Sequence, residues 1–329
     1  MTPADEAALR AMAKVELHCH LEGCVRPATL IELADANGVP LPTRDPEQIY
    51  AYSDMDSFLR VFELLSRAVV TQDDVRRITL ESLEDAAASG VVYREMFVNP
   101  TVHPACPYPE LLAGLREGLA QARERHGVLG RVIMSIYRSH PPEAALRMVE
   151  EVAANPCDEV VGIGMDGDEL AGPPLLFRSA YEAAAAAGLR RTAHAGERFD
   201  PAEIRACLDV LGCERIDHGY GVLADDGLLR RCREERVPFT YAWLSTLYNY
   251  RGPLAEHPFR RMGDAGLRMS LGSDDPAIGG TDLASDYVTV CESFGWTAEE
   301  MRRQNADAVE AAWCGPDDKA WVRERLAAG

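Results

Sequence analysis

The stretch Val15-Glu16-Leu17-His18-Cys19-His20 alternates apolar and polar side chains over six positions. A period of two is typical of a β-strand with one buried face. Further short segments rich in Val and Ile follow, separated by longer stretches with Leu and Ala at helical spacing. The predicted strands are Val15–His20, Val91–Val98, Arg131–Tyr137, Val160–Met165, Arg190–His194, Arg215–His218, Pro238–Trp243 and Arg268–Ser273. Eight strands alternating with helices predict an α/β protein with a closed (β/α)8 barrel of the TIM type.

Helical periodicity marks the segments between these strands. The predicted helices are Pro109–His126, Pro142–Ala153, Leu175–Ala187, Pro201–Leu211 and a terminal helix at Asp317–Gly329. The first interval is too long for one helix, and Ser53–Ala68 predicts a helical segment inserted after the first strand. This segment either packs against the barrel, with Phe58, Phe62 and Leu65 on one face, or covers the mouth as a lid. No linker, repeat or charge block interrupts residues 1–329, so we expect a single domain.

The charge balance excludes some classes of partner. Lys and Arg total 34 against 53 Asp and Glu, which gives a formal net charge of −19 and a pI of about 4.9. This balance argues against a surface that binds nucleic acid or an anionic membrane. No apolar window approaches the ~20 residues that a membrane helix needs, and the first residues lack a basic region followed by an apolar core. We therefore expect a cytoplasmic protein.

Nine cysteines are scattered along the chain, at Cys19, Cys24, Cys106, Cys157, Cys207, Cys213, Cys232, Cys291 and Cys314. An odd number without a C-x-x-C pair argues against a zinc knuckle or a redox motif and favours reduced thiols. Cys19 lies between two histidines, but strand alternation points it to the opposite face. We expect Cys19 to pack in the interior and not to bind a metal.

Two histidines spaced i, i+2 project from one face of the first predicted strand. His18 and His20 are close enough to bind one metal ion, although a structural pair gives the same pattern. Polar residues also end three later strands, namely His194, His218 and the pair Asp274-Asp275. Each of them alone also fits a strand-terminal residue or a helix cap. Barrel enzymes, however, collect catalytic groups at the carboxyl ends of their strands, and three imidazoles with one carboxylate suit zinc with a position left for water.

Four ordered motifs connect the chain to a known family. They are His18-Cys19-His20-Leu21-Glu22-Gly23, His194-Ala195-Gly196-Glu197, His218-Gly219-Tyr220 and Ser273-Asp274-Asp275-Pro276. On these motifs, from about Lys14 to Trp313, the chain resembles the adenosine deaminase family of the amidohydrolase superfamily. The cysteine-ligated nucleobase deaminases, with H-x-E and P-C-x-x-C, are a different class that the sequence does not match.

The resemblance implies roles for individual residues. It implies one zinc ion (Zn2+) per chain, bound by His18, His20, His194 and Asp274. It further implies that Glu197 protonates purine N1 and that His218 orients and helps deprotonate the metal-bound water. Asp275 would contact N7, and the backbone N–H of Gly167 would meet N3.

The chemistry requires such a set independently of the family. Zinc lowers the pKa of bound water to roughly 7 and so supplies hydroxide at neutral pH. Attack at C6 of the purine pushes electrons onto N1, so a protonated carboxylic acid must lie there, with its pKa raised by a desolvated pocket. Glu197, three residues after His194, is well placed for this role.

Departures from the family pattern concern the substrate. Many adenosine deaminases have Asp at the position of Glu22, which the family uses for the sugar 5′-hydroxyl. Glu22 and the E-x-F-x-[DN]-P-x-x-H pattern at Glu95–His103 look closer to the bacterial adenine deaminase-like branch. On the seventh strand, Tyr241–Tyr250 contains one Trp and three Tyr, which either pack the loop or shape the pocket for a substrate larger than adenosine. Ser245 in this segment is a further candidate substrate-binding residue.

The resemblance therefore implies a zinc-dependent hydrolase that deaminates a 6-aminopurine nucleoside, adenosine or a close relative, to the 6-oxopurine and ammonia. The alternative in the same class is an adenine or aminodeoxyfutalosine deaminase. A catalytically silent relative is disfavoured, because the candidate ligands, Glu197 and His218 are all present. A two-metal amidohydrolase with a bridging lysine is disfavoured, because only Lys14 and Lys319 occur and neither lies in a predicted strand. The expected partner is a small purine.

Overall fold

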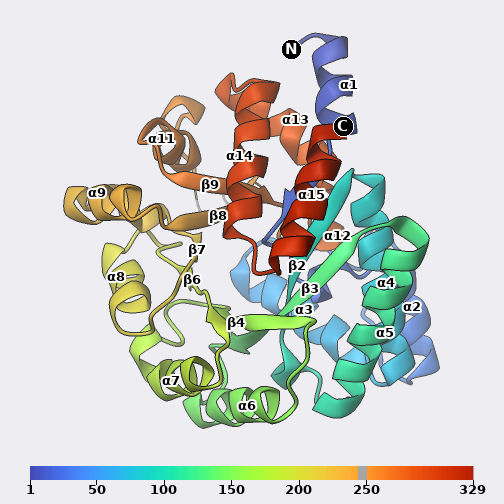
Figure 1. Ribbon diagram of the computed structural model, residues 1–329. Helices are drawn as coiled ribbons and strands as arrows, with labels where there is room; N and C mark the ends of the chain where they lie inside the picture. Colours follow the sequence, from blue (N-terminus) through green and yellow to red (C-terminus); the bar gives the residue numbers. More distant parts are fainter. Residues whose placement is uncertain (244–249, 329) are drawn as a thin grey trace.

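Parallel strands form the centre of the molecule, and helices surround them (Figure 1). The structure, a computed structural model, describes residues 1–243 and 250–328. In this range the strands are β1 (Lys14–Glu16), β2 (Val91–Val98), β3 (Leu129–Tyr137), β4 (Val160–Asp166), β5 (Arg190–Arg191), β6 (His194–Ala195), β7 (Ile216–His218), β8 (Pro238–Ala242) and β9 (Arg268–Gly272). They pair in the orders β1-β2-β3-β4-β5 and β6-β7-β8-β9, and each pair is parallel. Parallel neighbours need crossover connections, which the helices between the strands provide.

Two seams join these sheets into a closed barrel. At the first seam the predicted strand Arg190–His194 is divided into β5 and β6, and its two edges are bonded to different neighbours. Thr192 N donates to Ile163 O on β4 at 3.0 Å, whereas Ala193 O accepts from Asp217 N on β7 at 2.9 Å. At the second seam β1 and β9 meet just beyond their ends, through a parallel bridge between Cys19 and Asp274. The predicted (β/α)8 barrel is therefore confirmed, with the fifth strand in two pieces.

A glycine permits the close approach at the second seam. A Cβ atom on Gly272 would lie only 2.2 Å from the backbone oxygen of His18 and 2.8 Å from the His18 Cβ. Any side chain at this position would push β1 away from β9. Gly272 therefore allows the first and last strands to pack against each other.

The helices lie around the outside of the barrel (Figure 1). In the described residues they are α1 (Pro3–Ala11), α2 (Pro27–Ala36), α3 (Met55–Ala68), α4 (Gln72–Ala88), α5 (Tyr108–His126), α6 (Pro142–Ala154), α7 (Arg178–Ala186), α8 (Pro201–Asp209), α9 (Asp226–Glu234), α11 (Pro258–Asp264), α12 (Pro276–Gly279), α13 (Leu283–Phe294), α14 (Ala298–Ala311) and α15 (Pro316–Ala328). Short 3-10 helices are η1 (Glu22–Cys24), η2 (Pro100–Val102), η3 (Pro174–Phe177), η4 (Tyr220–Ala224) and η5 (Leu254–Glu256). No helix in the described residues has both the length and the apolar character needed to cross a membrane.

The long first interval contains α2, α3 and α4, and α3 corresponds to the predicted insert. Asp54 begins α3 with a capping box, because its carboxylate accepts from Ser57 N at 2.7 Å. Leu65 is buried in the main core, and Phe62 packs with Val102 and Tyr137 in a smaller cluster. The insert therefore packs on the barrel.

The barrel interior also holds a buried ion pair. Arg215 Nη1 donates to Glu95 Oε2 at 2.8 Å, and both side chains are fully buried. Tyr93 Oη donates to Glu95 Oε1 at 2.7 Å, and the Arg215 guanidinium lies 4.0 Å from the ring centroid of Trp313. Because each charge is paired inside the protein, loss of one partner leaves the other buried without compensation.

We expect Arg215→Met to lower the free energy of unfolding by about 3–5 kcal/mol, because Glu95 then keeps its buried charge without a partner. Urea unfolding measures this loss, with the exposed Arg230→Met on α9 as the control. Adding Glu95→Gln should restore part of the stability. Equal stability of the single and double variants would contradict the role of the pair.

Candidate metal centre and active site

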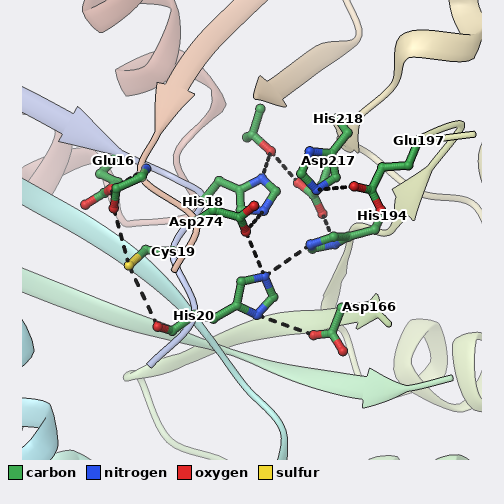
Figure 2. Close-up of polar contacts among 12 residues, drawn as sticks. Glu16, His18, Cys19, His20, Asp166, His194, Glu197, Asp217, His218 and Asp274 are labelled. Carbon is green, nitrogen blue, oxygen red and sulfur yellow. Dashed lines mark hydrogen bonds and ion pairs between the residues drawn. The ribbon is translucent and has the colours of Figure 1, made fainter. Parts of the chain in front are cut away.

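Four histidines and one aspartate converge at the carboxyl ends of the strands (Figure 2). One nitrogen or oxygen atom from each of His18, His194, His218 and Asp274 lies within 4.8 Å of the others. His20 joins this cluster, because its Nε2 lies 3.2 Å from His194 Nε2 and 3.3 Å from Asp274 Oδ1. All five side chains are buried. The structure therefore brings the four predicted ligands together and places His218 beside them.

Local backbone geometry aims these side chains at one another. His18 and His20 follow β1, and Cys19 between them points away, with its Sγ 3.1 Å from Cys24 Sγ. All nine cysteines lie in the described residues and are free. His218 and Asp274, at the ends of β7 and β9, have φ angles of 64° and 62°. Non-glycine residues adopt this left-handed conformation at a cost, and they keep it where the surrounding structure enforces it.

A buried carboxylate, Asp217, orients two of the histidines. Asp217 Oδ1 accepts from Thr240 Oγ1 at 2.6 Å, so the Thr240 oxygen in turn accepts from His18 Nδ1 at 2.8 Å. The other ring nitrogen, His18 Nε2, faces the cluster and lies 3.2 Å from Asp274 Oδ1. Asp217 Oδ2 lies 3.6 Å from His194 Nδ1. Burial raises the pKa of Asp217, but His194, His18 and Arg215 lower it overall, so the carboxylate is ionised.

His20 has a different supporting carboxylate. Asp166, the last residue of β4, places its Oδ2 3.6 Å from His20 Nδ1 (Figure 2). Metal-binding histidines commonly have a carboxylate behind the second ring nitrogen. The sequence analysis did not identify Asp166 or Asp217 as supports. The available signal was their position at strand ends, Asp166 on β4 and Asp217 directly before His218.

The donor set fits a metal ion. Imidazole nitrogens and a carboxylate oxygen are the ligands that zinc prefers at such sites. His18 Nε2 is buried and has no hydrogen-bond partner among the described residues, although it lies 3.2 Å from Asp274 Oδ1. The local field also favours positive charge, because Asp275, Asp274 and Asp166 outweigh the effect of burial and raise the pKa of His20 well above its usual value. A divalent cation would satisfy both requirements.

Glu197 lies beside the cluster and has the properties of a proton donor. Its Oε1 is 3.6 Å from His218 Nε2. Burial, followed by the carboxylates of Glu169 and Asp274, raises the pKa of Glu197 to about 8, so the acid is protonated at neutral pH. Glu169, which the sequence analysis did not single out, accepts from the backbone N–H groups of Glu197 and Arg198 at 2.9 and 3.0 Å. It thereby holds the loop that carries the acid.

His218 is suited to accept a proton. Burial, together with the neighbouring His18 and His194, lowers the pKa of His218 well below its usual value. The ring is therefore neutral, and its Nδ1 lies 3.1 Å from Tyr220 Oη. A neutral imidazole next to a protonated carboxylic acid provides one base and one acid at the same place.

A cavity of about 400 Å³ opens at the cluster. Phe58, Leu59 and Phe62 of α3 form an apolar part of its wall. Gly167 also lines it, with a φ of 90° that favours glycine. Asp275 lines the same cavity, and its Oδ1 is buried without a hydrogen-bond partner in the described part of the chain. Gly167 and Asp275 therefore lie where the sequence analysis expected ligand contacts.

Other predicted substrate contacts lie elsewhere. Glu22 is fully buried and is absent from the described residues that line the cavity. Trp243 is buried against His257 and Phe294, with ring centroids 5.3 and 5.4 Å apart, and is also absent from that lining. Ser245 belongs to residues 244–249 and lies outside the described residues.

A (β/α)8 barrel with a histidine–aspartate cluster at the carboxyl ends of its strands defines the class of metal-dependent barrel enzymes. The model of the family described as adenosine deaminase matches residues 13–328. The chain belongs to this family.

Individual relatives are similar over nearly the whole chain. An adenine deaminase from Streptomyces coelicolor is 38% identical over 323 residues, which is 96% of this chain and 94% of the relative. Among solved structures, an amidohydrolase from Burkholderia ambifaria with bound zinc has a TM-score of 0.92 at 36% identity, covering 99% of this chain and 93% of that one. An adenine deaminase from Arthrobacter aurescens has a TM-score of 0.90 at 32% identity, covering 96% and 98%.

We expect Asp217→Asn to weaken metal binding by about 10–100-fold, because an amide lacks the charge that supports His18 and His194. Elemental analysis should find one zinc ion per parent chain, and competition with a chelator compares the affinities. Asp226→Asn, an exposed change on α9, is the matched control. Metal retention by Asp217→Asn at the level of the control would exclude this supporting role.

Proposed function

We propose that this protein is a zinc-dependent adenine deaminase, which converts adenine and water into hypoxanthine and ammonia. The position of Glu22 is the observation that favours adenine over adenosine as the substrate. The family resemblance assigns this carboxylate to a sugar hydroxyl, but here it is buried, contacts His103 and is absent from the described cavity lining. The names of the similar proteins also support adenine, the alternative at the sequence level, better than adenosine, the main expectation.

We assign the zinc ion to His18, His20, His194 and Asp274. Their convergence, the free Nε2 of His18 and the carboxylates behind the imidazoles support this assignment. When bound, zinc acidifies water to a pKa of roughly 7 and so makes a nucleophile available at neutral pH. The fourth histidine of the cluster, His218, then remains for proton transfer.

Glu197 and His218 move the protons in this proposal. The neutral ring of His218 accepts a proton from the attacking water and holds that water toward C6 of the base. Glu197 donates its proton to N1 as the ring carbon becomes tetrahedral, and this donation removes the charge that would otherwise collect on the ring. The 3.6 Å separation of the two groups allows both to act on one substrate.

Asp275 and Gly167 orient the base. The partner-free Oδ1 of Asp275 is assigned to N7, and the backbone N–H of Gly167 to N3. Both contacts address the purine ring and not a substituent on N9. Neither assigned contact requires a substituent on N9, so both are available to a free base.

A panel of adenine, adenosine, deoxyadenosine and aminodeoxyfutalosine tests the substrate. We expect kcat/KM for adenine to exceed that for each nucleoside by at least about tenfold, equivalent to 1.4 kcal/mol, because no free carboxylate at residue 22 receives a sugar hydroxyl. Loss of the ultraviolet absorbance of the 6-amino chromophore measures each rate. A nucleoside with the higher kcat/KM would replace adenine as the proposed substrate.

We expect Glu197→Gln to keep its metal and lose about 10²–10⁴-fold in kcat, because an amide cannot give a proton to N1. Metal content and the thermal unfolding temperature are measured on the same preparation. Glu182→Gln, an exposed change on α7, is the matched control. A variant with kcat within a few fold of the parent would show that another group protonates the ring.

A further inference from the structure

Glu22 and His103 form a buried pair that the proposed chemistry does not use. His103 Nε2 lies 3.0 Å from Glu22 Oε1, and both side chains are almost completely buried. The Asn99 backbone N–H also donates to Glu22 Oε1, at 2.9 Å. His103 Nδ1 in turn lies 3.0 Å from the backbone oxygen of Ser66. Both ring nitrogens of His103 therefore face oxygen atoms, one on Glu22 and one on the backbone of Ser66.

One contact of His103 leads to α3. Ser66 belongs to α3, whose Phe58, Leu59 and Phe62 line the cavity. The hydrogen bond from His103 therefore ties the last turns of α3 to the segment that follows β2. A side chain at position 103 without the Nδ1 donor would remove this contact between α3 and the segment after β2.

A second set of contacts leads from Glu22 to the metal cluster. Asn99, whose backbone contacts Glu22, donates from its side-chain Nδ2 to Asp166 Oδ1 at 2.8 Å. Asp166 Oδ2 faces His20 Nδ1 at 3.6 Å (Figure 2). A chain of contacts thus runs from Glu22 through Asn99 and Asp166 to a proposed zinc ligand.

We propose that Glu22 and His103 are a positioning pair that holds α3 at the cavity wall and Asp166 behind His20, and that Glu22 contacts no substrate. The pair gives a physical role to Asn99 and His103, which the Glu95–His103 pattern contains and the proposed mechanism leaves unused. The proposal rests on the proposed function for the choice of adenine in the assay and for the assignment of His20 as a zinc ligand.

Two substitutions distinguish the contact toward α3 from the contacts toward Asp166. His103→Gln keeps a donor near the Nε2 position for Glu22 and loses the bond to Ser66, so we expect KM for adenine to rise about tenfold with kcat within about twofold of the parent. Glu22→Ala removes the acceptor for both His103 and the Asn99 backbone. We therefore expect kcat to fall about 10–100-fold, with weaker zinc retention against a chelator. His126→Gln, at the end of α5, is the control for His103→Gln.

A conservative variant tests whether Glu22 acts through hydrogen bonds. Glu22→Gln still accepts from Asn99 and His103, so we expect it to recover most of the kcat and zinc retention that Glu22→Ala loses. The double variant Glu22→Gln, His103→Gln keeps an amide–amide contact, so its loss should not exceed that of the worse single variant. This double variant also tests the positioning pair if Glu22→Ala does not fold.

Three results would overturn the positioning pair: an unchanged KM in His103→Gln, multiplied losses in the double variant, or a Glu22→Ala effect confined to nucleosides. The last result would show that Glu22 contacts the sugar of a nucleoside substrate. If the parent prefers adenosine, the proposed function fails by itself, and the same variants are then compared for adenosine turnover and zinc retention. The two failures therefore remain distinguishable.

Discussion

Closure of the barrel between β1 and β9 is the constraint on which the metal site depends. Asp274 N donates to His18 O at 3.2 Å, and His20 N donates to Asp274 O at 2.8 Å. The backbone of Asp274 is thus bonded to both histidines from the other end of the chain. Glu16 secures the same seam, because its Oε1 accepts from Ser273 N and Ser273 Oγ at 2.8 and 2.6 Å. Without this contact between the first and last strands, the position of Asp274 relative to His18 and His20 would not be fixed.

The site also depends on carboxyl groups whose surroundings drive them to opposite protonation states. Asp217 is ionised in spite of its burial, because two imidazoles and Arg215 surround it. Glu197 is buried next to other carboxylates, and its pKa is raised to about 8. The same type of group is therefore ionised in one position and carries a proton in another. Burying so many charged groups is costly unless each has a partner, which explains why the interior contains connected networks.

Several features of the site follow from residue order alone. His18 and His20 share a face because strand side chains alternate, and His194, His218 and Asp274 lie together because parallel strands end at one edge of a barrel. The contacts of Glu22, in contrast, do not follow from residue order. Its position in the motif predicts contact with a sugar, yet the folded chain places it against a histidine 81 residues further along. No local pattern indicates that contact, because it requires η1, η2 and α3 to meet.

The sequence by itself determined the barrel, because strand and helix periodicity are local properties. Strand ends and the family resemblance together indicated the histidine–aspartate cluster and the candidate acid Glu197. Only the tertiary structure decided that the fifth strand is divided into β5 and β6, that Asp217 and Asp166 support different histidines, and that Glu22 is paired away from the cavity. These are contacts between segments far apart in the chain. Their geometry is set by how the barrel closes and how its loops pack, and no short stretch of residues contains that information.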